Sequence, residues 1–262
     1  MQERRRSMKE KMNKIPVFYA CDDNFVKYTM VSLQSMMDHA SKEAQYEIHV
    51  LHTNISEEMQ KKMHAMENAN FSVQFDHVTE YLHSIQEKLP LRDYYSKTTY
   101  FRLFIAEMFP EIDKAIYIDS DTVVLGDIAQ LYAYDLGDAY VGACREQVMI
   151  QEEVYGTYVE KVLGVERDNY FNAGMLVINC EQFRKNHVLK QFMELLPMYN
   201  FVVTQDEDYL NLICHNKVCW LPQKWNVEVF GQIPCREEEI CVLHYIMVSK
   251  PWHYNDCRLQ EY

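Results

Sequence analysis

The chain has 262 residues, of which 48% are hydrophobic and 25% charged, a composition typical of a globular protein with a sizeable core and not of a disordered one. Lysine and arginine number 26 against 39 aspartate and glutamate residues, so the formal net charge is −13. That charge repels polyanions and excludes nucleic acid as the expected partner. No apolar run of the sequence approaches the roughly 20 residues that span a bilayer, so any membrane contact is expected to be peripheral.

Residues 1–14 carry several arginines and lysines and little to bury, which predicts a basic extension outside the folded domain. This start runs into charged residues instead of the apolar stretch of a signal peptide. The eight cysteines form no Cys-x-x-Cys pair of a zinc site, and reduced thiols are the simpler interpretation. We therefore expect a cytoplasmic protein, with at most peripheral contact at the inner face of the membrane.

Alternating apolar and polar segments predict strands and helices from residue 15 onward. Ser56 is expected to cap a helix, because two acids follow it in the first turn, where the helix dipole favours them. Strands that alternate with helices predict an α/β fold with a Rossmann-like, mostly parallel sheet and helices on both faces, in one domain over 15–262. The expected strands are 15–20, 46–53, 71–75, 114–118, 139–143 and 175–179, and the expected helices are 28–40, 57–68, 99–109, 181–199 and 205–214.

The sharpest chemical feature is a pair of carboxylates, Asp119 and Asp121, directly after the apolar strand 115–118. Ligands of such sheets collect at the carboxyl ends of the strands, and two like charges one residue apart need a cation to coexist there. This pattern predicts a divalent metal site. Two alternatives stay open: a solvated Asp-Ser-Asp turn, and the nucleophile motif of haloacid dehalogenase-like phosphatases, although about a hundred residues precede the motif here.

Seven short motifs stand in an order that resembles glycosyltransferase family 8, the retaining sugar-nucleotide enzymes that include lipopolysaccharide galactosyl- and glucosyltransferases and, more distantly, glycogenin. The resemblance extends from about residue 15 to 252. It implies a GT-A fold with a nucleotide-binding half, about 15–125, and an acceptor-side half, about 126–262. The motifs are Ala20 to Phe25, Thr98 to Leu103, Ala115 to Asp127, Asp135 to Asp138, Phe171 to Gly174, Gln205 to Asn211, and His244-Tyr245 through Lys250-Pro251-Trp252.

The resemblance also implies the residues of the site. Asp119, Asp121 and His244 would ligate a divalent cation, and two carboxylates with an imidazole suit Mn²⁺ better than the alternative, Mg²⁺. Asp22 and Asn24 would contact the uracil and ribose of the donor. The implied donor-binding set is Asp22, Asn24, Arg102, Ser120, Asn172, Ala173, Asp206, Glu207 and Lys250, and the implied catalytic set is Arg102, Asp206 and Glu207.

Three positions add detail to this resemblance. Lys250 would pair with the donor diphosphate, but Met247 replaces a glycine of the same closing loop, and its Cβ could push the loop back. Glu207 stands where family members often carry Gln, so it is either a nucleophile for double displacement or a group that only stabilises positive charge on the sugar. Glu146 lies where the family places an acid near sugar and acceptor, or is a plain surface residue.

We expect a metal-dependent retaining hexosyltransferase that moves glucose or galactose from UDP-glucose or UDP-galactose to a hydroxyl of a saccharide or glycolipid acceptor of the cell envelope. Met247 keeps open an alternative, a non-catalytic or weakened nucleotide-sugar binding protein of the same fold. The sequence names neither the acceptor nor the oligomeric state, because function follows the site and not the fold.

Overall fold

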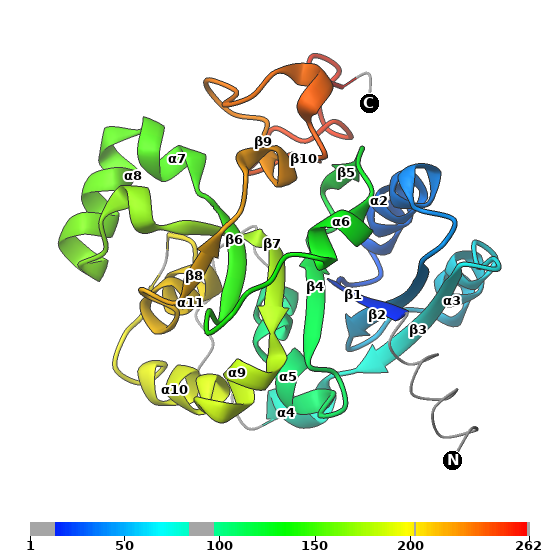
Figure 1. The fold of residues 1–262 in the computed structure, drawn as a ribbon, viewed down its shortest axis with the longest axis horizontal. Coiled ribbons are helices and arrows are strands. Elements are labelled where there is room, and N and C mark those ends of the chain that lie inside the picture. The colour runs from blue at the N-terminus through cyan, green and yellow to red at the C-terminus, as the bar shows by residue number, and fades with distance from the viewer. Residues whose placement is uncertain (1–13, 84–96, 202, 261–262) are drawn as a thin grey trace.

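The computed structural model describes residues 14–83, 97–201 and 203–260, which form two sheets with surrounding helices (Figure 1). The larger sheet has seven strands in the order β3-β2-β1-β4-β7-β6-β8, and the smaller has the order β5-β10-β9. The strands are β1 (Lys14–Ala20), β2 (Gln45–His52), β3 (Phe71–His77), β4 (Lys114–Ile118), β5 (Thr122–Val124), β6 (Val141–Arg145), β7 (Phe171–Asn179), β8 (Val218–Trp220), β9 (Val227–Glu228) and β10 (Val242–His244).

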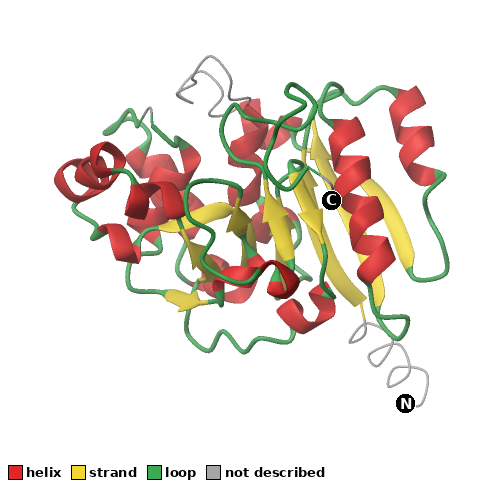
Figure 2. Ribbon diagram, turned by 90° about the horizontal axis from the view of Figure 1, so that it is seen from above, coloured by secondary structure: helices red, strands yellow, loops and turns green. Residues whose placement is uncertain are grey.

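The helices lie on both sides of the larger sheet, as Figure 2 shows. The α-helices are α2 (Val26–His39), α3 (Glu57–His64), α4 (Thr79–His83), α5 (Ile105–Met108), α6 (Ile128–Tyr132), α7 (Gln147–Gln151), α8 (Glu153–Tyr158), α9 (Cys180–Lys185), α10 (Val188–Leu195) and α11 (Asp206–Ile213). The other helical turns are η1 (Lys97–Leu103), η2 (Val159–Leu163), η3 (Arg167–Asn169), η4 (Gln223–Trp225) and η5 (Glu237–Glu239). None of the helices in the part of the chain that the structure describes has the length and apolar character needed to cross a membrane.

Two apolar cores cover the two faces of the larger sheet, because successive side chains of a strand point to opposite faces. In β1, Val17 and Tyr19 pack with α2 and α3 on one face, whereas Phe18 packs with η1 and α5 on the other. All three side chains have a relative exposure of 0%. The sheet is therefore the middle layer of a three-layer α/β fold, as the sequence predicts.

Strand direction decides which loops meet at the site. β1, β2, β3 and β4 are parallel neighbours, so their carboxyl ends lie at one edge of the sheet. β7 runs antiparallel to β4 and β6, which brings its amino-terminal end to that same edge. Ile118 pairs with Met175, and the Asp119 amide donates to the Gly174 carbonyl at 2.7 Å. The sheet thus joins the Asp119 motif to the motif Phe171 to Gly174.

The smaller sheet has no counterpart in the predicted elements. Its strand β10 pairs antiparallel with β5, and His244 stands opposite Thr122. A separate core that includes Val123, Val227 and Leu243 holds this sheet together. This pairing carries a residue from near the end of the chain back to the segment that follows β4, within reach of Asp121.

Most of the predicted elements of the larger sheet are confirmed, but two predicted helices differ. The segment 99–109 is a 3₁₀ turn, η1, followed by the short α5, and not one continuous helix. The segment 181–199 is divided into α9 and α10, because His187 has a left-handed backbone with φ of 54°, which a continuous right-handed helix excludes. Ser56 caps α3 as predicted, and its hydroxyl accepts from the Met59 amide.

The predicted division of the chain is not tested by the fold. The basic extension 1–14 lies outside the described residues except for Lys14, which begins β1. β4 belongs to the predicted nucleotide-binding half and β7 to the predicted acceptor-side half, and the two strands are neighbours in one sheet. The functional division into 15–125 and 126–262 therefore stays a prediction about ligands.

Candidate active site

A cavity of about 240 Å³ opens at the edge of the sheet where β4 ends and β7 begins. This edge lies next to the β1–β4 boundary, where strand order reverses, the position at which ligands of open α/β sheets bind. Nine of the predicted site residues line the cavity: Arg102, Asp119, Ser120, Asp121, Asn172, Asp206, Glu207, His244 and Lys250.

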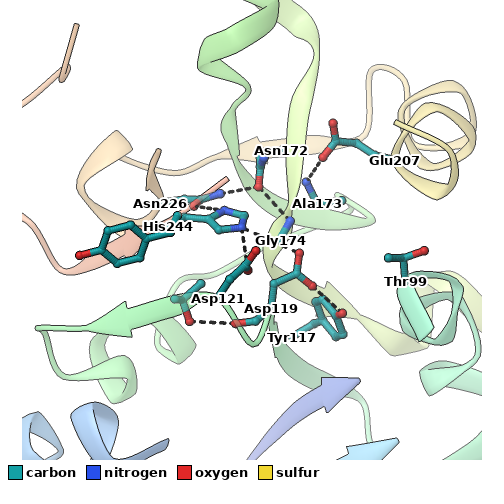
Figure 3. A network of polar contacts seen from close by, with 12 residues as sticks. Thr99, Tyr117, Asp119, Asp121, Asn172, Ala173, Gly174, Glu207, Asn226 and His244 are labelled. Carbon is teal, nitrogen blue, oxygen red and sulfur yellow. Dashed lines mark hydrogen bonds and ion pairs between the residues drawn. The ribbon is translucent and has the colours of Figure 1, made fainter. Parts of the chain in front are cut away.

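Asp119, Asp121 and His244 form the polar centre of this cavity and point toward one another in Figure 3. One potential ligand atom from each residue lies within 4.8 Å of the other two. His244 Nε2 lies 3.2 Å from Asp121 Oδ1 and 4.0 Å from Asp119 Oδ2. Two carboxylates and an imidazole are a ligand set that Mn²⁺ accepts.

Two further observations show that this centre fits a cation. Asp121 Oδ1 is buried and has no hydrogen-bond partner among the described residues, a costly condition for a carboxylate oxygen unless a cation meets it. Gly174 allows the His244 ring and Asp119 to come close to each other, since a Cβ there would collide with the His244 ring and lie 2.7 Å from Asp119 Oδ2. Glycine is required here by close approach and not by backbone angles.

Lys250 occupies the other side of Asp121. Its ammonium lies 2.5 Å from Asp121 Oδ2 and also donates to the Tyr245 carbonyl. Burial raises the pKa of Asp121, but the charge of Lys250 and, after it, the contact with His244 outweigh this effect and hold the pKa below its ordinary value. Asp121 is therefore ionised at neutral pH, as a metal ligand must be.

Arg102 connects the carboxylate centre to the first turn of α11. Its Nε lies 2.8 Å from Asp206 Oδ2 and donates to the Thr99 carbonyl, and its Nη1 donates to the Ala173 carbonyl. Burial lowers the pKa of Arg102, but Asp119 and Asp206 outweigh burial and keep the guanidinium charged. Burial raises the pKa of Asp206 to about 7 against the attraction of Arg102.

The start of β7 presents two polar groups to the cavity wall. Asn172 donates from Nδ2 to Glu146 Oε2 at 2.5 Å, and the Ala173 amide donates to Glu207 Oε2 at 2.7 Å. Burial and, after it, the charge of Glu146 raise the pKa of Glu207 well above its ordinary value. Glu146 is 4% exposed, which excludes the plain surface interpretation of this residue.

Three predicted donor-binding residues are not placed in the cavity wall by the described structure. Asp22 accepts from the Asn24 and Phe25 amides through Oδ1 and so shapes a turn, and Asn24 is exposed. The neighbouring Cys21 and Phe25 line the cavity instead. Ala173 takes part through its backbone alone. The roles proposed for these residues toward a nucleotide stay predictions.

The family model for glycosyl transferase family 8 matches residues 16–256. The chain belongs to glycosyltransferase family 8. This membership confirms the resemblance and argues against the phosphatase alternative. It also identifies the protein as an enzyme of hexosyl transfer, in agreement with the relatives described next.

Two solved glycosyltransferase structures and one relative of known name show how similar this chain is to known proteins. The galactosyltransferase LgtC, solved with donor and acceptor sugar analogues, is 26% identical, with a TM-score of 0.76, over 93% of this chain and 91% of that chain. The bifunctional glycosyltransferase WbbM is 25% identical, with a TM-score of 0.81, and this chain spans 48% of its length. The lipopolysaccharide 1,3-galactosyltransferase of Salmonella typhimurium is 24% identical over 92% of this chain and 74% of its own length. The expected GT-A fold is confirmed.

Two residues that contact the side chains of this site were not predicted from the sequence. Tyr117 donates its hydroxyl to Asp119 Oδ1 at 2.7 Å, and the fully buried Asn226 contacts both His244 and Asn172. Tyr117 could have been suspected from its place two residues before Asp119, on the same side of the strand. Asn226 carries no signal, because it stands in a short loop outside every motif.

Proposed function

We propose that this family 8 enzyme transfers glucose or galactose from a UDP-sugar to a hydroxyl of a cell-envelope saccharide or glycolipid, with retention of configuration and with Mn²⁺ or Mg²⁺. The convergence of Asp119, Asp121 and His244 inside the cavity carries the proposal. The names of the relatives, which include a lipopolysaccharide galactosyltransferase, support the acceptor class. A bound divalent cation would act as a Lewis acid on the departing phosphate oxygens.

Residues of the cavity would bind the cation, pair with the diphosphate and orient the donor sugar. Asp119 and Asp121 hold two fixed negative charges for the cation, and Lys250 stands beside them as a point charge for the diphosphate. Arg102 and Asn172, which both line the cavity, would orient the hydroxyls of the donor sugar. The buried walls exclude the water that would hydrolyse the donor.

The place of action is also part of the proposal. All eight cysteines are free, four of them buried, which supports a reducing compartment such as the cytoplasm. Contact with the inner face of the membrane would then be peripheral, and the acceptor would reach the cavity from that side.

The test is the metal dependence of UDP binding, measured by calorimetry with Mn²⁺ or with EDTA. We expect the wild type to bind UDP with Mn²⁺ and not with EDTA. The Asp121→Asn variant should bind UDP under neither condition. Asp38→Asn, on the exposed end of α2, is the matched control and should bind like the wild type. Equal UDP affinity with and without EDTA would reject the metal assignment.

Donor hydrolysis and transfer separate the enzyme from a binding protein. With Mn²⁺ and a UDP-sugar, the wild type should release UDP slowly without acceptor and faster with an envelope glycan, and proton NMR of the product should show the anomeric configuration of the donor. Tight UDP-sugar binding with neither hydrolysis nor transfer would favour the weakened binding protein that Met247 leaves open.

A further inference from the structure

Asn226 lies between the two functional parts of the cavity. It is fully buried, stands just before β9, and touches the metal-site His244 on one side and the sugar-site Asn172 on the other. Asn226 Oδ1 lies 3.1 Å from His244 Nδ1, and Asn226 Nδ2 lies 2.8 Å from Asn172 Oδ1. Figure 3 shows these contacts as one continuous row that ends at Gly174.

The orientation of every group in this row follows from one backbone amide. The Gly174 N–H can only donate, and it donates to Asn172 at 2.9 Å, so the atom it meets is the amide oxygen of Asn172. The group of Asn226 that faces this oxygen must therefore be its NH₂. The oxygen of Asn226 is then turned toward His244, and this assignment does not depend on the usual ambiguity of amide flips.

The same logic fixes the proton of His244. An amide oxygen accepts and cannot donate, so His244 Nδ1 must carry the hydrogen. In the neutral ring, Nε2 then carries a lone pair, which faces Asp121 Oδ1 at 3.2 Å. With a neutral ring, two acceptors face each other across this distance, and a cation bound between or beside them would remove their repulsion. The unpartnered state of Asp121 Oδ1 agrees with this arrangement.

We propose that Asn226 is a positioning residue that holds His244 in the Nδ1–H tautomer and presents Nε2 to the divalent cation. The proposal rests on the metal site of the proposed function and adds a residue outside the ligand set. Hydrogen bonds from outside the ligand shell set the tautomer of metal-binding histidines and commonly change metal affinity by about 10–100-fold.

Asn226 also joins the cation site to the sugar site. Asn172 uses its oxygen for Asn226 and Gly174, which turns its NH₂ toward Glu146 at the cavity wall. One buried side-chain amide thus links the two sides through hydrogen bonds of fixed direction. Asn226→Leu removes this bridge while keeping the number and branching of the side-chain heavy atoms, whereas Asn226→Asp keeps an acceptor for His244 Nδ1.

The first test is made on the metal-free wild type and needs a variant only to assign the signal. Long-range ¹H–¹⁵N NMR of the metal-free wild type, at a pH where the His244 ring is neutral, should show a protonated Nδ1 and an unprotonated Nε2. The His244→Gln variant identifies the signal. A neutral ring with the proton on Nε2 would overturn the proposal.

The second test compares Mn²⁺ affinities, measured by electron paramagnetic resonance of free Mn²⁺ at a fixed UDP concentration. Asn226→Leu should weaken Mn²⁺ binding by about 10–100-fold and lose the single Nδ1–H tautomer, and Asn226→Asp should restore both to near the wild-type level. Asn179→Leu, at the opposite end of β7, is the matched control and should bind Mn²⁺ normally.

The outcomes separate this inference from the proposed function. If the Asn226→Leu variant binds Mn²⁺ as tightly as the wild type, the positioning role of Asn226 is overturned. The proposal of a metal-dependent transferase then stands. Absence of Mn²⁺ binding by the wild type overturns both. Circular dichroism confirms that each variant is folded, and the wild-type NMR result stands even if Asn226→Leu fails to fold.

Discussion

Met247 has a left-handed backbone with φ of 57°, a conformation that glycine adopts without a Cβ penalty. The backbone at this position thus has a conformation that suits a glycine. The Met247 side chain is 40% exposed and lies in the cavity wall. The Cβ does not push the backbone into another conformation, and the side chain instead adds bulk to the cavity wall.

We expect Met247→Gly to tighten UDP-sugar binding or raise turnover by a few fold. The change removes the side chain from the cavity and relieves a left-handed conformation that costs about 1 kcal/mol. Calorimetry and steady-state kinetics measure the two effects. Val248→Gly, at the neighbouring exposed position, is the control. No change in affinity or turnover would show that this position does not approach the donor.

Glu207 is a carboxyl group whose pKa is raised by burial and, after it, by Glu146, so its nucleophilic, ionised form is less favoured than that of an exposed glutamate. Its oxygen accepts from the Ala173 amide, which a glutamine can retain. We therefore expect Glu207→Gln to lower turnover about tenfold, a change of about 1.4 kcal/mol in the barrier. A loss of several orders of magnitude, with a glycosyl adduct on the wild type in intact-protein mass spectrometry, would instead establish a covalent nucleophile.

At the scale of elements, the short strand β9 carries a carboxyl group into the interior. Both oxygens of Glu228 lie 3.1 Å from the Gln147 amide, and the side chain has 0% exposure. Burial and, after it, the charge of Glu146 raise the pKa of Glu228 well above its ordinary value. This group therefore retains its proton at pH values where an exposed glutamate has lost it.

A pKa that is raised in the folded state contributes stability at low pH, and that stability is lost as pH rises through the folded pKa. We expect the free energy of unfolding of the wild type to fall with rising pH in the range above the ordinary glutamate pKa, by at most about 1.4 kcal/mol per pH unit for this one proton. Glu228→Gln should show a flatter dependence in urea unfolding at several pH values. Glu43→Gln, an exposed control, should follow the wild type; parallel curves for all three proteins would contradict the prediction.

At the scale of the whole molecule, the proposed cation site joins distant parts of the chain. Asp119 and Asp121 follow β4, whereas His244 ends β10 and belongs to the smaller sheet. A ligand that binds all three residues contacts the folded protein only, because no unfolded chain holds them together. Ligand binding should therefore stabilise the fold as a whole.

We expect Mn²⁺ with UDP to raise the melting temperature, with a gain of about 2.7 kcal/mol when the ligand is at 100 times its dissociation constant. Differential scanning fluorimetry with UDP alone, Mn²⁺ alone, both, and both with excess EDTA measures the effect. Asp121→Asn should show no gain under any of the four conditions. An equal shift with UDP and EDTA would contradict the shared site.

Local patterns were sufficient for much of this protein. Short apolar or β-rich runs predicted β1, β2 and β4, and apolar alternation predicted β3. The acids after Ser56 predicted the start of α3, and two carboxylates after a buried strand predicted a cation site, because each of these signals lies within a few neighbouring residues. The motif order predicted the family, and nine of the implied site residues line one cavity.

Only the tertiary structure decided the features that depend on distant partners. The three-residue strands β5 and β10 are too short to show a period, and their pairing alone places His244 beside Asp121. The reversed direction of β7 brings Asn172 to the same edge of the sheet. Asn226 acquires its role from contacts with residues 54 and 18 positions away, which no local pattern encodes, because a hydrogen-bond direction is set by the partner and not by the residue itself.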